Sequence, residues 1–498
     1  MTGVTGIYRQ GFFLLKVIEV KSLYNTGNLY RSQGESSSIR RRVSILYKLE
    51  TEISMAKKRS RKKQLPEAPV KVTIESLAHD GRGVAHVDGK VIFIDEALPG
   101  EEVEFVYTDS RKDYAEGKVV TLLSRAADRV DALCPHYGVC GGCSFQHVES
   151  TAQIRIKQEL LAEQFKRIGK VEMPELWEPL AGPHWGYRRK ARMGVKYVAK
   201  KNRVLVGFRE RRHPYLAEID SCIVMHPIVG TKLLALGEMI AELTIRDKIP
   251  QIEVAIGDDQ CVLSIRVLEP PTEADKELMR AFGHAHNMSL CLQSKGPDTI
   301  VPLDGEPEII PTYALPDQNL EFKFKPAMFT QVNYEINKQM INRVLETLNL
   351  NENDTVLDLF CGLGNFTLPM AKFAGRVVGV EGDQPLVNHA KENARHNGIT
   401  NVEFYAADLS KDLSDQPWAN QKYNKIMLDP SRAGASEVLQ HFKKWLPEQI
   451  VYVSCNPSTL ARDAGILVNE LGYKLVKAGV MDMFPQTGHV ESIALFEK

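Results

Sequence analysis

The sequence predicts a multidomain α/β protein that ends in a doubly wound, Rossmann-like domain. Residues 326–498 alternate short apolar runs with helical stretches, the pattern of a mainly parallel sheet with helices on both faces. Residues 64–125 instead hold short alternating strands separated by turns, as in a small β-barrel. A chain of 498 residues is also too long for one hydrophobic core, so we expect roughly three domains.

Composition excludes several classes of protein. Apolar content of 43% and charged content of 25% are ordinary for a globular protein, and the net charge is zero, so a nucleic-acid site must come from local basic patches. Eight irregularly spaced cysteines favour reduced thiols or metal ligands in a cytoplasm over a secreted disulfide framework. No run approaches the ~18 apolar residues of a membrane span, so we expect a cytoplasmic protein with no membrane partner.

The first 63 residues differ from the rest. Residues 1–54 show no helix or strand period, and Met55 is followed by the basic run 57–63. We expect residues 1–63 to be a disordered or mis-assigned extension with a basic tail, and Met55 to be the natural start. The alternative is an organelle-targeting peptide, but acidic residues such as Glu19 and Glu35 do not fit its acid-poor composition.

The barrel is expected over residues 64–125. Its predicted strands, separated by turns at 80–83 and 99–101, are 70–74, 91–94, 102–106 and 117–120. Short strands separated by turns in this way are typical of an OB-like barrel, and this segment resembles a TRAM domain, which binds RNA. The alternative is a β-module that does not bind RNA.

A central domain is expected over residues 126–325, with a helix at 153–169. Cations and aromatic residues interleave at 185–192 and again at 208–213. Cations hold phosphates while rings stack on unpaired bases, so this mixture favours single-stranded RNA. A solvated strand edge is the alternative.

The C-terminal domain is expected over residues 326–498. Its predicted strands are 356–360, 376–380, 402–405, 425–428, 450–453 and 492–496. The first strand runs into a glycine-rich loop with Gly362 and Gly364, and the second ends at Glu381, an acid in the position that usually binds ribose hydroxyls. Thr367 occupies the third glycine position of a strict dinucleotide motif, which favours S-adenosylmethionine (SAM) over NAD.

Cysteines at two places in the sequence are candidates for a functional role: a group of four, and Cys455. Cys134, Cys140 and Cys143 follow a C-x5-C-x2-C spacing, and Cys222 is a fourth candidate ligand. From spacing alone, zinc, an iron–sulfur cluster and four unligated thiols all stay open. Cys455 follows an apolar strand in a Ser-Cys-Asn-Pro turn, which presents a thiol at the rim of a sheet; its alternative role is core packing.

Five stretches of the C-terminal third resemble the RNA uracil-C5 methyltransferases that use SAM, and further resemblance covers almost everything from about residue 55 onward. In family order they are Gln331-Val332-Asn333, Asp358-Leu359-Phe360-Cys361-Gly362, Asp429-Pro430-Ser431-Arg432-Ala433-Gly434, the segment from Ser454 to Asp463, and His489-Val490-Glu491. The resemblance implies that SAM is bound by Gln331, Phe360, Asn365, Glu381, Asp408 and Asp429. It also implies a [4Fe-4S] cluster on Cys134, Cys140, Cys143 and Cys222.

The resemblance further implies a covalent mechanism. Cys455 would attack C6 of uracil as the nucleophile, Glu491 would remove the C5 proton, and Arg432 would support the substrate and its enolate. Such a nucleophile is expected to be more acidic than a free cysteine, whose pKa is about 8.5.

Barrel and cysteine cluster together resemble the 23S rRNA (uracil(1939)-C(5)) group, so we expect a single-stranded or unfolded loop of 23S rRNA as partner, and a monomer. Alternatives are another 23S rRNA uridine, tRNA, or a non-catalytic ribosome-assembly factor. Two other classes fit less well: an amino-methyltransferase has an aromatic residue after Asp-Pro-Pro, and a DNA cytosine-C5 enzyme has its cysteine where this chain has Ser431.

Overall fold

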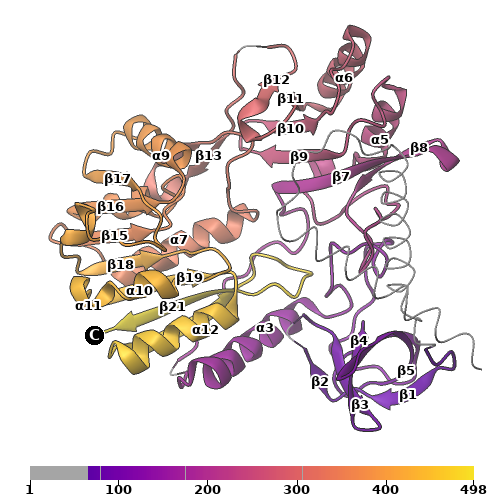
Figure 1. Cartoon of the computed structure of the whole chain (residues 1–498), viewed down its shortest axis with the longest axis horizontal. Helices are drawn as coiled ribbons and strands as arrows, with labels where there is room; N and C mark the ends of the chain where they lie inside the picture. Colours follow the sequence, from indigo (N-terminus) through magenta and orange to yellow (C-terminus); the bar gives the residue numbers. More distant parts are fainter. Residues whose placement is uncertain (1–64, 79, 174, 306) are drawn as a thin grey trace, which may run out of the picture. The chain divides into compact units, whose positions relative to one another are not determined.

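The computed structural model describes residues 65–498 apart from 79, 174 and 306. The predictions for residues 1–63 therefore lie outside the described residues. Residues from Pro66 to Lys498 form one compact unit, and its sheets have six, six, two and seven strands (Figure 1).

The first sheet corresponds to the predicted barrel. It has the order β1-β5-β6-β4-β3-β2, and its strands are β1 (Val70–Thr73), β2 (Ser76–Leu77), β3 (Gly83–Val87), β4 (Lys90–Asp95), β5 (Glu102–Ser110) and β6 (Tyr114–Leu122). Alternate residues of β4 and β5 point inward, so Ile92, Ile94, Val103 and Phe105 form a separate small core.

The second sheet belongs to the central part of the chain. It has the order β12-β11-β10-β9-β7-β8, formed by β7 (Lys190–Val198), β8 (Arg203–Gly207), β9 (Gln251–Ile256), β10 (Cys261–Arg266), β11 (Ser289–Gln293) and β12 (Ile300–Pro302). Helices α5 (Leu233–Glu242) and α6 (Glu273–His286) share its apolar core. A hairpin of β13 (Thr312–Leu315) and β14 (Leu320–Lys323) leads to the C-terminal part.

The C-terminal sheet has the order β17-β16-β15-β18-β19-β21-β20 (Figure 1). Its strands are β15 (Thr355–Leu359), β16 (Arg376–Glu381), β17 (Val402–Ala406), β18 (Lys425–Leu428), β19 (Gln449–Ser454), β20 (Lys474–Met481) and β21 (Glu491–Glu497). The first five are parallel, and β21 lies antiparallel between β19 and β20. The Rossmann-like prediction is confirmed, although β20 was not predicted.

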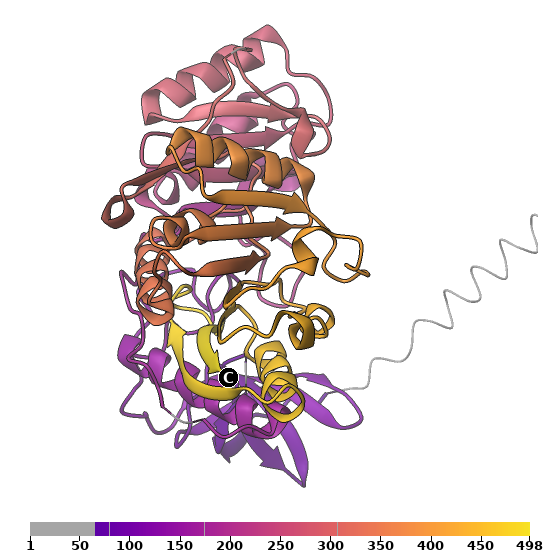
Figure 2. The same ribbon diagram turned by 90° about the vertical axis from the view of Figure 1, so that its left-hand side faces the viewer.

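Helices cover both faces of this sheet (Figure 2). Successive residues of β15 point to opposite faces, so Val356 joins one apolar core and Leu357 the other. The first core includes α7 (Tyr334–Leu348), α8 (Thr367–Ala371) and α9 (Gln384–His396); the second includes α10 (Ser436–Leu439), α11 (Phe442–Trp445) and α12 (Pro457–Gly465).

One helix of the central part also belongs to the second of these cores. Helix α3 (Ser150–Gln164) continues as a π-helical turn to Gly169, where the predicted helix ends. Its Leu161 and the following Phe165 are fully buried with Tyr452 of the C-terminal sheet, and Figure 1 shows α3 beside α12. In the described part of the chain, no helix has the length and apolar character needed to cross a membrane.

Candidate active site

The loop after β15 begins with an unusual backbone conformation. Phe360 has φ +66°, which is uncommon for a residue with a side chain, and Gly364 has φ +93°, a region that favours glycine. The Phe360 N–H donates to the Val380 carbonyl of β16 at 2.9 Å, so the chain turns sharply at the end of the strand. This turn opens the carboxyl edge of the sheet in front of α8.

Three predicted acids lie at the same edge, because parallel strands end on one side of a sheet. Glu381 ends β16 and accepts hydrogen bonds from the backbone N–H of Gly362 (3.1 Å) and of Gly382 (2.7 Å). Asp408 follows β17 and is exposed, and hydrogen bonds led by that from Ser410 lower its pKa to about 2. Asp429 follows β18; burial raises its pKa to about 7.

The other two predicted cofactor residues are amides. Asn365 is fixed by three hydrogen bonds: its Oδ1 accepts from Tyr313 Oη (2.9 Å) and Asn337 Nδ2 (3.1 Å), and its Nδ2 donates to Asn337 Oδ1 (2.9 Å). Gln331 is half-buried and lies shortly before α7, the helix that supplies Asn337. The carboxyl edge is therefore surrounded by polar groups from several elements.

Sequence reasoning gave no role to Asp358, which the structure places near the end of β15. It is fully buried, and burial raises its pKa to about 8 although Thr367 donates a hydrogen bond to it at 2.5 Å. Its Oδ1 has no hydrogen-bond partner among the described residues. An acid inside an apolar strand was the signal that could have identified it.

The sheet register brings Cys455 and Glu491 together. Strands β19 and β21 pair antiparallel as far as Ser454 opposite Ser492; Cys455 directly follows β19, and Glu491 is the first residue of β21. The two residues lie close together, because the Glu491 charge acts on the Cys455 thiol. The turn is also tied to the loop after β18, because Asn456 Nδ2 donates to the Arg432 carbonyl at 3.0 Å.

The charges around Cys455 differ from the expectation. Burial raises the pKa of its thiol, the nearby carboxyls of Glu491 and Asp429 raise it further, and Arg432 opposes them. The expectation of an unusually acidic cysteine is therefore wrong. Glu491 is fully buried, and its pKa is well above the ordinary value because of burial and the Asp429 charge.

A cavity of about 500 Å³ opens in front of Cys455. Arg432 lines it, together with His489 and with Gly142 and Cys143 of residues 134–143, which carry three of the predicted cluster cysteines and are called the cysteine loop below. His489 belongs to residues 482–490, which join β20 to β21 and are called the connector below. Glu491 directly follows the connector, so the position of the connector determines where the carboxyl lies.

The four predicted cluster cysteines line one cavity of about 230 Å³. All four are half-buried and free of disulfides: Cys134, Cys140, Cys143 and Cys222. Burial raises the pKa of Cys143 to about 12, and the charges of the other three add to the rise, as expected for neighbouring thiols. Within the described residues, no group of three or more His, Cys, Asp or Glu side chains has the arrangement to hold a metal ion.

Comparison with known proteins first defines a class. The chain matches the TRAM domain at residues 68–120 and the family described as tRNA (Uracil-5-)-methyltransferase at residues 272–498. Its fold is similar to that of Pyrococcus abyssi tRNA (uracil-54, C5)-methyltransferase in complex with S-adenosyl-L-homocysteine, with a TM-score of 0.64 and 22% identity over 86% of this chain and 100% of that one. Fold and motifs together define a uracil-C5 methyltransferase.

Closer relatives then identify the family. The 23S rRNA (uracil(1939)-C(5))-methyltransferase RlmD of Methylococcus capsulatus is 52% identical over 440 residues, which are 88% of this chain and 99% of the relative. The protein of the same name from Francisella tularensis subsp. novicida is 50% identical over 441 residues, 87% and 98% of the two chains. The chain belongs to the family of 23S rRNA (uracil(1939)-C(5))-methyltransferases, which confirms the resemblance seen in its motifs.

Proposed function

We propose that this enzyme methylates C5 of one uridine in 23S rRNA, of the uracil-1939 type, and forms 5-methyluridine. The observation that carries the proposal is the strand pairing that brings Glu491 beside Cys455, near Arg432, in a chain about half identical to relatives of that name. A thiol and a guanidinium that line one cavity, with a buried carboxyl beside the thiol, are the groups that covalent activation of uracil requires.

Cys455 activates the base. Its proton leaves to solvent, and the thiolate Sγ forms a bond to C6 of uracil. The electron pair of the C5–C6 double bond then moves through C4 onto O4, so the ring becomes an enolate that is nucleophilic at C5. Arg432, whose charge acts on Cys455, stabilises the negative charge that develops on O4.

Glu491 completes the reaction. SAM, when bound, supplies the methyl group that C5 receives. The Glu491 carboxylate then takes the C5 proton, the C5–H electrons re-form the C5–C6 double bond, and the C6–S bond breaks to release the Cys455 thiolate. Because burial raises the pKa of Glu491, its carboxylate binds a proton more strongly than an exposed one and is the better base.

We assign SAM to the carboxyl edge of the C-terminal sheet. The residues that would hold it are Gln331, Phe360, Asn365, Glu381, Asp408 and Asp429. The donor set fits this molecule: the turn at Phe360 gives access to the backbone, Glu381 is oriented by three backbone N–H groups, and half-buried Asp429 would face a cation.

We also assign a [4Fe-4S] cluster to the cavity lined by the four cysteines. Such a cluster takes one thiolate for each iron, so its ligands surround a space instead of converging on one ion. The cavity of about 230 Å³ between Cys134, Cys140, Cys143 and Cys222 supports this assignment over a single zinc ion. The cluster would hold the cysteine loop beside the cavity of Cys455, because Gly142, Cys143 and His489 line both cavities.

The RNA partner is proposed to be a single-stranded or unfolded loop of 23S rRNA, bound by a monomer in the cytoplasm. The TRAM domain match and the names of the relatives support an RNA substrate. A loop is required because the C6 face of a stacked, paired uracil is closed to a nucleophile.

The decisive experiment combines purified enzyme, labelled SAM and 23S rRNA from a strain that lacks this enzyme, with mass mapping of 5-methyluridine. We expect label at one uridine with the wild type and none with Cys455→Ala, while both proteins bind S-adenosylhomocysteine equally. Label in another 23S rRNA uridine or in tRNA would correct the substrate. No label in any RNA would favour a non-catalytic assembly factor, and full activity of Cys455→Ala would exclude the nucleophile.

A further inference from the structure

One turn of the barrel reaches the cavity of Cys455. Asp80 lines the same cavity of about 500 Å³ as Cys455 and Arg432, although it comes from a different sheet. The turn is closed by hydrogen bonds from Ala78 N to the Arg82 carbonyl (2.8 Å) and from Gly81 N to the Ala78 carbonyl (2.9 Å).

Asp80 and Gly81 both pack closely on neighbouring segments. Gly81 has φ +86°, and a Cβ atom there would lie 1.7 Å from the ring of Phe145, so the Gly81 backbone packs directly on this ring. A Cβ atom on Gly488 of the connector would lie 3.0 Å from the Asp80 carbonyl. The barrel turn and the connector are therefore in close backbone contact beside the catalytic residues.

The Asp80 side chain is held in one orientation but keeps hydrogen-bond acceptor positions free. Arg82 Nε donates to its Oδ2 at 2.7 Å, and the Arg82 backbone N–H donates to its Oδ1 at 3.3 Å. Arg82 itself is fixed by Glu116 (3.0 Å) and by the ring of Phe93, which lies 4.7 Å below the guanidinium. A carboxylate has roughly four acceptor positions, and the Asp80 side chain is 40% exposed, so acceptor positions remain for a ligand.

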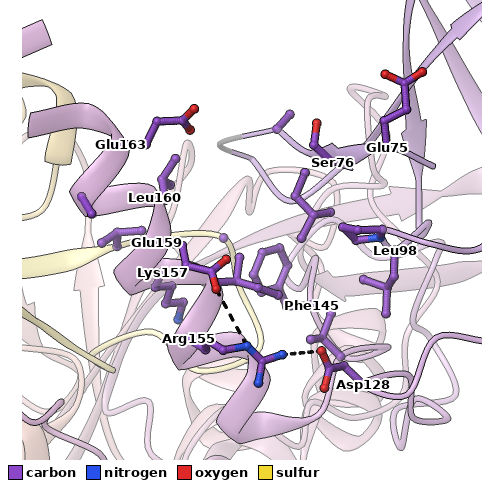
Figure 3. Close-up of a pocket in the computed structure, with 18 of the residues that line it drawn as sticks. Glu75, Ser76, Leu98, Asp128, Phe145, Arg155, Lys157, Glu159, Leu160 and Glu163 are labelled. Carbon is purple, nitrogen blue, oxygen red and sulfur yellow. Dashed lines mark hydrogen bonds and ion pairs between the residues drawn. The ribbon is translucent and has the colours of Figure 1, made fainter. Parts of the chain in front are cut away.

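The neighbouring groove has a different character. It measures about 780 Å³, runs between β2 and α3, and shares Leu160, Gly488 and Val490 with the cavity of Cys455 (Figure 3). Three of its cations stand in ion pairs with carboxylates: Arg155 with Asp128 and Glu159, Lys157 with Asp482, and Arg167 with Glu163. These cations of the groove are thus paired within the protein. Asp80 is also paired, with Arg82, but its carboxylate keeps acceptor positions free, so it is the better candidate for selective contact with RNA.

A carboxylate facing RNA has a restricted chemistry. Of the described residues that line the cavity of Cys455, Asp80 alone carries a carboxylate. It repels phosphates, but it accepts hydrogen bonds from the amino groups of adenine, cytosine and guanine. Uracil has no amino group, so such a contact falls on a neighbour of the target uridine.

We propose that Asp80 is a specificity-determining residue, which accepts a hydrogen bond from the exocyclic amino group of a base adjacent to the target uridine. The inference rests on the proposed function, because it needs the uridine to lie over Cys455. It gives the barrel a direct part in choosing the site of methylation, in addition to general affinity for RNA.

The test uses fragments of 23S rRNA in which each base next to the target uridine is changed in turn to A, C, G and U. The matched variants are Asp80→Asn and Asp88→Asn, which remove the same charge from the same barrel. Asp88 lies at an exposed turn between β3 and β4 and is not among the residues of the cavity. Binding of S-adenosylhomocysteine checks that each variant is folded.

For the wild type and Asp88→Asn, we expect kcat/KM to be ~10-fold higher with an amino-bearing base than with uracil at one neighbouring position. Asp80→Asn should lose this preference or shift it toward uracil, because its amide can donate to a carbonyl. An unchanged preference in Asp80→Asn, or no preference in the wild type, would overturn the role of Asp80 alone. Absence of 5-methyluridine with every fragment would instead overturn the proposed function.

Discussion

Lys157 and Asp482 form a buried ion pair that fixes the connector, and replacing Lys157 tests this role. Lys157 Nζ lies 2.7 Å from Asp482 Oδ1 and also donates to the Phe484 carbonyl at 3.1 Å. The two side chains are only 2% and 1% exposed. Lys157→Met keeps the length of the side chain but removes the ammonium group. Asp482, the first residue of the connector, then loses its ion-pair partner.

The expected loss of stability comes from the Asp482 carboxylate, which stays buried after the ammonium group is removed. Asp482 Oδ2 already has no hydrogen-bond partner among the described residues, so the variant leaves a buried carboxylate with neither charge partner nor full hydrogen bonding. Removal of one member of a buried pair costs about 3–5 kcal/mol, which is on the order of a hundred- to several-thousandfold in the unfolding equilibrium. Because Glu491 directly follows the connector, we also expect methylation to fall.

The assay compares thermal and urea unfolding with methylation rates for three variants. Lys166→Met is the control for removal of a positive charge, because Lys166 is exposed in the turn that follows α3. The double variant Lys157→Met/Asp482→Leu replaces the pair by apolar side chains of similar size. It should recover most of the stability, because a well-packed apolar pair is neutral or better than a buried ion pair.

Two results would refute the reasoning. Equal unfolding of Lys157→Met, Lys166→Met and the wild type would mean that the pair is not buried in solution. Failure of the double variant to recover stability would mean that the loss does not come from the unpaired Asp482 charge.

Three further predictions concern the proposed chemistry and the N-terminal segment. Glu491→Gln cannot remove the C5 proton, so we expect methylated RNA attached to Cys455, seen as a slow band on a denaturing gel that disappears with Cys455→Ala; free turnover without the band would exclude Glu491 as the base. Cys222→Ser should lose the iron and brown colour of anaerobically purified enzyme, whereas stoichiometric zinc without iron in the wild type would contradict the cluster. Removal of residues 1–54 should leave methylation unchanged, since every recognised motif lies beyond Met55, and a large loss would reveal a role for the extension.

Local patterns in the sequence were sufficient to predict the C-terminal fold and its glycine-rich loop, whereas most candidate residues were assigned from the family resemblance. Apolar runs at strand spacing predicted β15 to β19 and β21, and the glycine-rich loop predicted the carboxyl edge. These features depend on neighbours in the chain: a period of two defines a strand, and a glycine permits a turn. The motifs at Asp429, Cys455 and Glu491 followed from resemblance, which records residue identity but no distances.

Only the tertiary structure decided which of these residues meet. The insertion of β21 between β19 and β20 brings Glu491, its first residue, beside Cys455, which follows β19, and a shift of one residue in this pairing would turn the side chains of β21 to the other face of the sheet. Burial of the thiol, together with the carboxyls of Glu491 and Asp429 that the fold brings near it, raises the pKa of Cys455, and this environment was not predicted. Likewise, α3 joins a core far along the chain, and Asp80 reaches a cavity built by another sheet. Such contacts depend on long-range packing, which no local sequence period encodes.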